Sequence, residues 1–337
     1  MEEPKRVKAE DMSRFARLLL FLSMAAGGAP RVLAAPDGEQ VISGWPKAVR
    51  ALALCPEGRF LAAGGDDAEV LVYDLPGRKI KFRLAARGPV TALAISPDGV
   101  LLAIGQKGLE VDLVNLSTGR RIRRLGPLAG HPRHLVFGPR GDILAVAGQA
   151  QAITVFELRG SRPVSRLLAG HTSWVNHVAF SPDGRKLAGA GWDHAVRLFD
   201  VDSGALERSM FGHTFAVNAA LFSADGQQVI SVSDDQSLRV FSASSGAALR
   251  RLPGPAITCL ARAGKSETLV AGTFNGRILW LSDRQLVGQR ITPAHKGAVH
   301  AVAVTPDGSV AVSAGQDGRI RLWRGKPAGG APREGAP

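Results

Sequence analysis

A short turn signal recurs at nearly constant spacing along the chain, and this repeat constrains the fold more than any other feature. Its copies are Pro56-Glu57-Gly58, Pro97-Asp98-Gly99, Pro139-Arg140-Gly141, Pro182-Asp183-Gly184, Ala224-Asp225-Gly226 and Pro306-Asp307-Gly308. Successive starts lie 41 to 43 residues apart until the last gap of 82, which holds a degraded copy at Ala263-Gly264. Self-similarity at such a period is typical of repeat architectures. The chain therefore contains seven copies of one unit.

Each unit has the pattern of four short strands. An alternating apolar run such as Val175 to Phe180 precedes the turn, and a second run such as Lys186 to Ala190 follows it. A third run ends in an aromatic residue or its substitute, and a fourth is richer in Arg. Four antiparallel strands in about 42 residues match one propeller blade, which must stack on its neighbours to bury both faces. The sequence predicts an all-β, seven-bladed β-propeller over residues 37–325.

The ends of the repeat region predict how the ring closes. After Trp323 the chain runs into Gly and Pro with no fourth strand, whereas Gln40 to Ser43 form an extra piece before the first repeat. We expect Gln40–Ser43 to be the outermost strand of blade seven, so that the N-terminal strand joins the last blade. The Gly-, Pro- and Ala-rich tail, 326–337, is expected to be disordered.

Residues 1–34 have the pattern of an export signal. Arg14 and Arg17 precede the apolar run Leu18 to Ala26, and small residues follow up to Ala34. The run is shorter than the roughly 20 apolar residues that span a bilayer. We expect a cleaved signal peptide and a periplasmic or extracellular protein. The alternative is an uncut leader on a cytosolic protein, and either Met1 or Met12 is the start.

The repeats resemble those of the WD-repeat family. Gly170-His171, Gly212-His213 and Ala294-His295 each place a His 28 residues before Phe199, Phe241 and Trp323. The likeness covers about 41 to 325, is strong in repeats four, five and seven, and is weak in two and six. It implies a buried hydrogen-bond chain of His, Ser or Thr, Asp and Trp, which repeat seven matches with His295, Ser313, Asp317 and Trp323. Repeat five has Phe241 in place of Trp, and repeat four also has Gly189 in place of Ser.

A His, a Ser and an Asp close together also suggest a nucleophilic triad. The set recurs at the same place in several repeats, which a single active site does not need. The sequence contains no Gly-x-Ser-x-Gly elbow, phosphate loop or zinc-protease His pair. The first strands, which line a propeller's channel, offer mainly Ala, Val, Leu and Thr. We therefore predict no enzyme activity, no catalytic residue and no cofactor, with a propeller enzyme or cofactor-binding protein as the alternative.

The resemblance implies that a protein or peptide partner binds the top face of the ring, with a monomeric propeller acting within a complex. By alignment, the top-facing positions are Arg50, Asp66, Gln106, Gln149, Trp174, Asn176, Trp192, Asn218, Asp234, His300 and Gln316. Trp174 and Trp192 fall in one blade beside Asn176 and are the candidate anchor pair. Packing of both rings over the rim is the alternative.

The chain carries a formal charge of +13, and +11 remains without residues 1–34. Basic residues gather in the predicted fourth strands, namely Arg78, Lys79, Lys81, Arg83, Arg120, Arg121, Arg123, Arg124, Arg250 and Arg251. Such charges protect a sheet edge from pairing. The alternative is a basic rim that holds a membrane surface or, with an uncut leader, nucleic acid. One Tyr and 13 Phe leave little for base stacking, which disfavours nucleic acid.

Two smaller features remain. His131 and His134 are close enough to suggest a metal site, but no neighbouring Cys or carboxylate completes a ligand set, so none is predicted. Cys55 and Cys259 fall in apolar strand patterns of repeats one and six, too far apart for a disulfide. We expect two buried free thiols.

Overall fold

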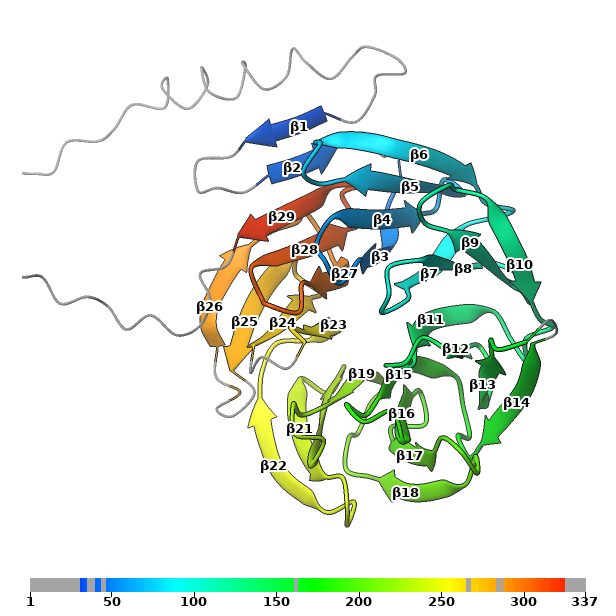
Figure 1. Ribbon diagram of the computed structural model, residues 1–337. Helices are drawn as coiled ribbons and strands as arrows, with labels where there is room; N and C mark the ends of the chain where they lie inside the picture. Colours follow the sequence, from blue (N-terminus) through cyan, green and yellow to red (C-terminus); the bar gives the residue numbers. More distant parts are fainter. Residues whose placement is uncertain are drawn as a thin grey trace, which may run out of the picture.

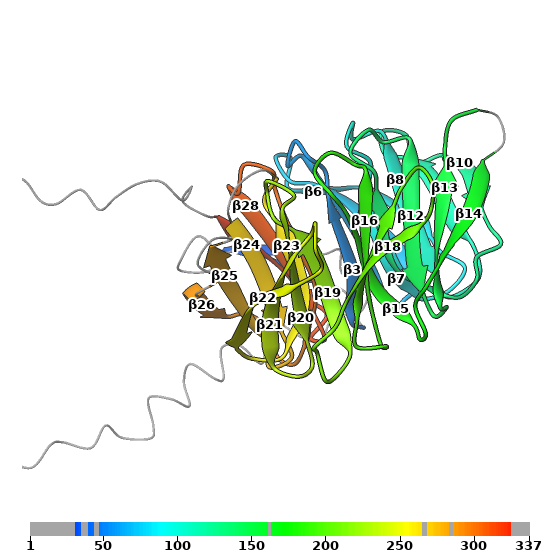
Figure 2. The ribbon, with the colours of Figure 1, turned by 90° about the horizontal axis from the view of Figure 1, so that it is seen from below.

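The computed structural model describes residues 31–34, 40–43, 47–160, 163–264, 268–282, 286 and 288–324. Every regular element in these ranges is a β-strand, and the strands form seven antiparallel sheets. Figure 1 shows the sheets as blades around a common centre, and Figure 2 shows the ring from the side. The predicted all-β, seven-bladed propeller is confirmed.

The chain visits the blades in order, and each blade is built from the inside outward. Blade one is β3 (Val49–Leu54), β4 (Phe60–Gly65), β5 (Glu69–Asp74) and β6 (Lys79–Ala85). Blades two and three are β7 (Val90–Ile95), β8 (Leu101–Gln106), β9 (Val111–Asn115) and β10 (Arg121–Leu125), then β11 (Pro132–Phe137), β12 (Ile143–Gly148), β13 (Ala152–Glu157) and β14 (Val164–Ala169).

Blades four and five are β15 (Val175–Phe180), β16 (Lys186–Gly191), β17 (Val196–Asp200) and β18 (Leu206–Met210), then β19 (Val217–Phe222), β20 (Gln228–Ser233), β21 (Ser237–Ser242) and β22 (Ala248–Pro253). Blade six is β23 (Ile257–Arg262), β24 (Thr268–Thr273), β25 (Arg277–Ser282) and β26 (Gly288–Pro293). Blade seven begins with β27 (Val299–Val304), β28 (Val310–Gly315) and β29 (Ile320–Arg324).

The core lies between blades rather than within them. Both faces of the middle strands are buried, whereas an outer strand such as β22 is almost wholly exposed. One cluster joins Val72 of blade one to Leu93 and Leu102 of blade two, and similar clusters join other neighbouring blades. Burial of apolar surface between stacked sheets is the main stabilising term for such a ring.

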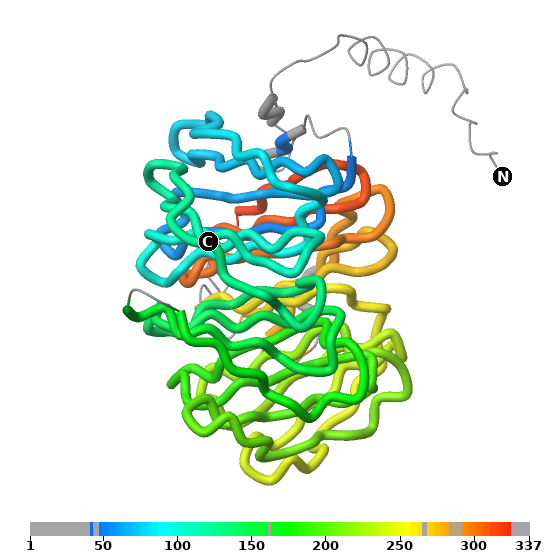
Figure 3. Tube along the Cα trace, turned by 90° about the vertical axis from the view of Figure 1, so that its right-hand side faces the viewer, coloured from blue at the N-terminus to red at the C-terminus, as the bar shows by residue number. Residues whose placement is uncertain are grey.

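Blade seven closes the ring with the N-terminal segment, as predicted. β2 (Gln40–Ser43) pairs antiparallel with β29, placing Ile42 opposite Ile320. Ile42 is 1% exposed and packs in the cluster shared by blades seven and one. Figure 3 shows the first and last described segments side by side. The two ends of the propeller therefore hold each other in one sheet.

One detail of this prediction is wrong. β1 (Arg31–Ala34) pairs with the free edge of β2, so blade seven has five strands and Gln40–Ser43 is not the outermost. An unpaired strand edge offers backbone N–H and C=O groups to any neighbouring strand. The rest of the predicted leader and the 326–337 tail lie outside the described residues. No helix in the described ranges combines the length and hydropathy needed to span a membrane.

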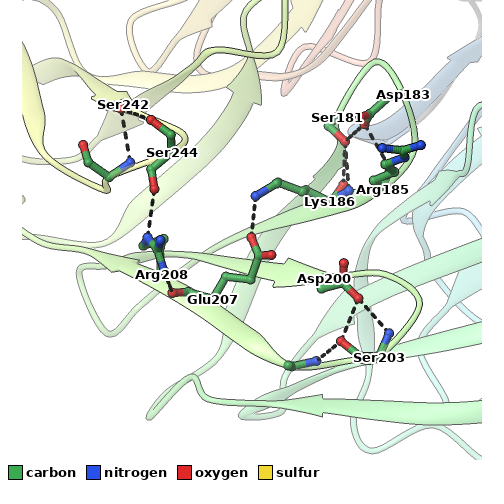
Figure 4. Close-up of polar contacts among 12 residues, drawn as sticks. Ser181, Asp183, Arg185, Lys186, Asp200, Ser203, Glu207, Arg208, Ser242 and Ser244 are labelled. Carbon is green, nitrogen blue, oxygen red and sulfur yellow. Dashed lines mark hydrogen bonds and ion pairs between the residues drawn. The ribbon is translucent and has the colours of Figure 1, made fainter.

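The recurring turn signal has a common hydrogen-bond pattern (Figure 4). Ser181 Oγ donates to Asp183 2.6 Å away, and the same carboxylate accepts the Arg185 N–H at 3.0 Å. Gly184 follows with φ +75°, a conformation that favours glycine. Arg208 Nε donates to Ser244 O of blade five at 3.0 Å, which ties two blades at the rim. The Pro-Asp-Gly spacing is therefore explained by local turn chemistry.

Candidate functional site

Repeat seven contains the hydrogen-bond chain that the family likeness implies. His295 Nδ1 lies 2.8 Å from Asp317 Oδ1, and His295 Nε2 lies 2.8 Å from Ser313 Oγ. Trp323 Nε1 donates to Ser313 Oγ at 3.0 Å. The Lys296 N–H also donates to Asp317 at 3.2 Å, so the chain connects a surface loop and the β28–β29 turn to the two strands β28 and β29.

Shorter versions recur in blades five and four. His213 contacts Asp235 at 2.9 Å and Ser231 at 2.8 Å, and Phe241 then ends the chain. In blade four His171 contacts Asp193 at 3.0 Å, but its Nε2 has no partner within the described chain because Gly189 lacks a hydroxyl. These His and Asp side chains are at most 8% exposed, so they are out of reach of a substrate. They form a structural frame.

Burial and hydrogen bonding shift the pKa values of the frame's carboxylates in opposite directions. Burial raises the pKa of Asp235, but hydrogen bonds from Ser237 and His213 outweigh it and bring the pKa to about 2. Asp193 has a pKa of about 2 by the same balance, with His171 as the main donor. Both carboxylates are therefore ionised at neutral pH and hold their loops as acceptors.

A bulge in every innermost strand builds the candidate binding site. In each of these strands the first and third residues pair with consecutive residues of the neighbouring strand, so the second residue is an extra one with no pairing partner. We call the seven second residues the bulge ring, and all of them line the cavity at the mouth of the axial channel: Arg50, Thr91, Arg133, Asn176, Asn218, Thr258 and His300. Arg50, Asn176, Asn218 and His300 were predicted from the sequence, whereas Thr91, Arg133 and Thr258 were not.

Four members of the bulge ring connect neighbouring blades. Each donates to the carbonyl of the first residue of the next innermost strand. The contacts are Thr91 to Pro132 at 2.6 Å, Asn176 to Val217 at 3.1 Å, Asn218 to Ile257 at 2.9 Å and Thr258 to Val299 at 2.6 Å. Because each of these hydrogen bonds joins one blade to the next, the four side chains stabilise the ring itself.

Arg50 of the bulge ring forms an ion pair with Asp66 and also lies beside a second ring member, His300. Arg50 donates to both carboxylate oxygens of Asp66, at 3.0 Å and 2.9 Å, and its Nη1 lies 3.5 Å from His300 Nε2. Burial lowers the pKa of His300, and the nearby Arg50 charge lowers it further. Arg50 and Asp66 neutralise each other on the blade-one side of the cavity.

The cavity encloses about 490 Å³, and its wall differs from the sequence prediction. The expected Ala, Leu, Val and Thr are present, but His134 and His177 also line it. Their rings stack with centroids 3.9 Å apart. Burial lowers the pKa of His134 to about 4 and holds that of His177 well below its ordinary value, so both are neutral at pH 7. The sequence pattern named no His among the channel-lining residues, and these two meet because β11 and β15 are neighbours.

The turns between second and third strands supply the other predicted site residues. Their first residue donates its N–H across to the preceding inter-blade loop, as Trp192 donates to Trp174 O at 2.8 Å. Asp66, Gln149, Asp234 and Gln316 occupy this position as expected. In blade two the equivalent residue is Lys107, whose N–H donates to Pro89 O. In blade six it is Phe274, which the sequence analysis did not name.

Gln106 is therefore a wrong assignment. Its side chain is 2% exposed, accepts the Arg87 N–H at 2.7 Å and donates to Asp112 at 3.3 Å. A buried amide with both ends paired supports the loop and offers no group to a partner. Lys107 is exposed and lines the cavity instead.

Trp174 and Trp192 form a fixed aromatic pair. Their ring centroids lie 5.7 Å apart at 59°, and Trp192 Nε1 donates to Asn176 Oδ1 at 2.9 Å. The two side chains remain 42% and 48% exposed. They pack on each other and still present apolar surface to solvent.

Three phenylalanines extend this surface. Phe211 and Phe215 in the loop before blade five, and Phe274 in the turn of blade six, are 60 to 69% exposed. With the two tryptophans they form what we call the aromatic band. Every Trp, Phe or Tyr that is exposed in the described ranges belongs to this band. All five lie in loops at the end of the ring that carries the bulge residues, which we call the top face.

Several basic side chains of the outer strands contact carboxylates of their own blades. Arg83 contacts Glu69 at 2.8 Å, and Arg121 and Arg124 each contact the buried Asp112 at 3.1 Å. Lys81 lies 4.2 Å from the centre of the Phe60 ring. These contacts favour the edge-protecting role of the strands over a continuous basic rim.

The remaining candidates lie apart. His131 Nδ1 contacts Gly108 O at 3.1 Å, whereas His134 stacks on His177. No group of three or more metal-ligating side chains occurs among the described residues. Cys55 and Cys259 are both free thiols, as expected, with Cys55 buried and Cys259 partly so. Burial raises the pKa of Cys259 to about 12, which makes its thiol unreactive.

Comparison with known proteins agrees with this architecture. The model of the family "WD domain, G-beta repeat" matches residues 36–74, 162–200, 204–242 and 288–324. Each matched range holds the outer strand of one blade and the first three strands of the next. Repeat one thus joins repeats four, five and seven, which the sequence pattern had singled out.

Curated relatives carry the same repeats. The chain is 32% identical to a WD repeat-containing protein of Schistosoma mansoni over 44% of this chain and 49% of the relative. A WD repeat-containing protein of Synechocystis is 31% identical over 42% and 41%. WD repeat and SOCS box-containing protein 1 of Xenopus tropicalis is 32% identical over 31% and 25%. The chain spans half or less of these relatives' length. Together these comparisons show that the chain carries WD repeats, four of them matched by the family model, on a seven-bladed β-propeller.

Proposed function

We propose that this protein is a non-catalytic interaction scaffold that binds a protein or peptide partner across the top face of its propeller. The observation that carries the proposal is the aromatic band. Exposed apolar rings are costly in water, and Trp, Tyr and Phe are enriched at the centres of protein interfaces. Their concentration on loops of blades four to six gives a partner a place to anchor.

The geometry of the band suits recognition. Asn176 holds the Trp192 indole, and Trp174 packs against it, so neither ring must be ordered when a partner arrives. A preorganised surface loses less conformational entropy on binding. We expect Trp174 and Trp192 to be the main anchors, and Phe215 and Phe274 to enlarge the contact.

The proposal includes export. Arg14, Arg17 and the apolar run that follows support a signal peptide ending near Ala34. N-terminal sequencing of the mature protein tests this part. A start near Ala35 supports export, whereas an intact leader contradicts it and returns a cytosolic partner to consideration.

The experiment for the main proposal measures partner binding to matched surface variants. The partner is identified by quantitative copurification and then titrated against purified protein. Trp174→Ala and Trp192→Ala are compared with Ile122→Ala and Leu167→Ala, which remove exposed apolar side chains from the outer strands β10 and β14. We expect each Trp variant to lose at least about 2 kcal/mol of binding free energy, as interface anchors do.

The two outer-strand variants should bind as the parent does. Equal affinity of all four variants would refute the top-face proposal. Unfolding midpoints measured in parallel separate lost contacts from lost folding.

A further inference from the structure

Two cations of the cavity lack partners in the described chain. Arg133 is the one bulge-ring member for which the structure gives neither a hydrogen bond nor an ion pair within the described residues. The side chain of Lys107, in the preceding blade, likewise has no hydrogen bond or ion pair within the described residues. Both residues are exposed and line the 490 Å³ cavity. The other ring members hold carbonyls of the next blade or, for Arg50 and His300, contact each other beside Asp66.

The two cations come from neighbouring elements. Lys107 begins the turn between β8 and β9, and Arg133 is the bulge residue of β11. His131 Nδ1 contacts Gly108 O at 3.1 Å, which fastens the loop before Arg133 to the residue after Lys107. Both charges therefore belong to one side of the cavity mouth, formed by blades two and three.

The cavity wall carries net positive charge. Its charged residues are Arg50, Lys107 and Arg133 against the single carboxylate of Asp66, and Asp66 is already paired with Arg50. Partial desolvation lowers the pKa of Arg133, and a counter-anion would relieve that cost. The neighbouring His177 has a buried Nδ1 with no partner in the described chain, and Gln149 adds an exposed amide. A cavity of this size holds a small ligand or a side chain.

We propose that the mouth of the axial channel is a binding site for an oxyanion, a carboxylate or phosphate group, held between Lys107 and Arg133. A guanidinium presents parallel N–H donors to such a group, and an ammonium adds a point charge. The inference deepens the proposed function: an acidic side chain of the bound partner enters the channel beside the aromatic band. A free oxyanion is the other source of the same chemistry.

The test uses the full protein and two probes. A fluorescein-labelled peptide of alternating Gly and Glu is titrated by anisotropy, with its Gly and Gln counterpart as the neutral control, and inorganic phosphate is the competitor. The variants are Arg133→Gln and Lys107→Gln. The matched control is Arg140→Gln, which removes the same charge from the turn at the opposite end of β11.

We expect the Glu peptide to bind in preference to the Gln peptide. Arg133→Gln and Lys107→Gln should each weaken it by about tenfold, the scale of one charge-assisted hydrogen bond. Arg140→Gln should change affinity less than twofold. Binding of phosphate alone with the same dependence on Arg133 also supports the site and assigns it to a free oxyanion.

The inference is overturned if neither probe binds, or if the three variants behave alike. That failure is distinguishable from failure of the proposed function. Loss of partner binding in Trp174→Ala and Trp192→Ala does not depend on the cavity, so the top-face scaffold would stand without an oxyanion site.

Discussion

The hydrogen-bond chain of blade seven makes a quantitative prediction for Ser313→Ala. The Ser313 side chain is fully buried, accepts the Trp323 N–H at 3.0 Å and contacts His295 Nε2 at 2.8 Å. Alanine leaves two buried polar groups without a partner. Each orphaned group costs about 1 to 3 kcal/mol, so we expect a loss of about 2 to 6 kcal/mol in the free energy of unfolding.

Blade five supplies the internal comparison. Ser231 contacts His213 Nε2 at 2.8 Å, but Phe241 has no N–H to donate. Ser231→Ala therefore orphans one group and should cost about 1 to 3 kcal/mol. The difference between the two variants isolates the contribution of the indole.

Urea unfolding followed by fluorescence and circular dichroism measures both losses. Ser165→Ala removes an exposed hydroxyl from β14 and should shift the free energy of unfolding by less than about 0.5 kcal/mol. The reasoning fails if Ser313→Ala and Ser231→Ala cost the same. It also fails if either one is as mild as Ser165→Ala.

Two further predictions concern closure and pH. A chain starting at Ala35 lacks β1 but keeps β2, and its urea unfolding midpoint should match that of the parent. Ile42→Ala changes the cluster between blades seven and one and should lower the free energy of unfolding by about 2 to 5 kcal/mol. Equal midpoints for the parent and both variants would contradict the role of β2 in closing the ring. His134 has a folded pKa of about 4, and burial holds the pKa of His177 well below its unfolded value near 6.5, so the folded state binds fewer protons. The free energy of unfolding therefore keeps the full contribution of these two His above about pH 6.5. As the pH falls toward 4, it decreases by up to about 1.4 kcal/mol per pH unit for each His that is protonated only in the unfolded state. Unfolding free energies of His177→Asn from pH 7 to 4 should fall less steeply than those of the parent, and parallel curves would refute the assignment.

Local turn chemistry explains why so much of the fold was predictable. The Pro-Asp-Gly turns fix where first strands end and second strands begin, because Asp183 and its counterparts bond their own backbone. The number of strands was predicted by counting the repeats. The ring-closing role of Gln40–Ser43 was predicted because the last repeat lacks a fourth strand. β1 was not predicted, since Arg31–Ala34 also fits the end of an export signal, and a pattern of four residues cannot decide between the two.

The candidate site was less predictable for a different reason. Top-face positions depend on which residue begins each second turn, and a shift of one residue exchanges a buried Gln106 for an exposed Lys107. A usable signal was present: the turn residue lies four positions before the first buried apolar residue of the third strand, as Trp192 precedes Val196. The same rule identifies Lys107 before Val111 and Phe274 before Ile278.

The stacked His134 and His177 had no such signal. Each occupies the third position of an innermost strand, where Ala51 and Ala92 stand in other blades. Within the sequence pattern of one blade, either His is a single departure from the Ala found at that position in other blades. Only the adjacency of β11 and β15 shows that one ring covers the other.

The candidate cations occur in blades where the hydrogen-bond frame is replaced or incomplete. Blades five and seven, with His213 and His295, use their polar loop groups to hold the frame. Blade two lacks that His and instead buries Gln106 against Asp112, which leaves Lys107 outside. Because a side chain bonded within the frame is not available to a partner, recognition is expected where the frame is replaced or incomplete. Under the proposed function, the cations of blades two and three would select charge and the aromatic band of blades four to six would supply apolar contact, as two parts of one top-face surface.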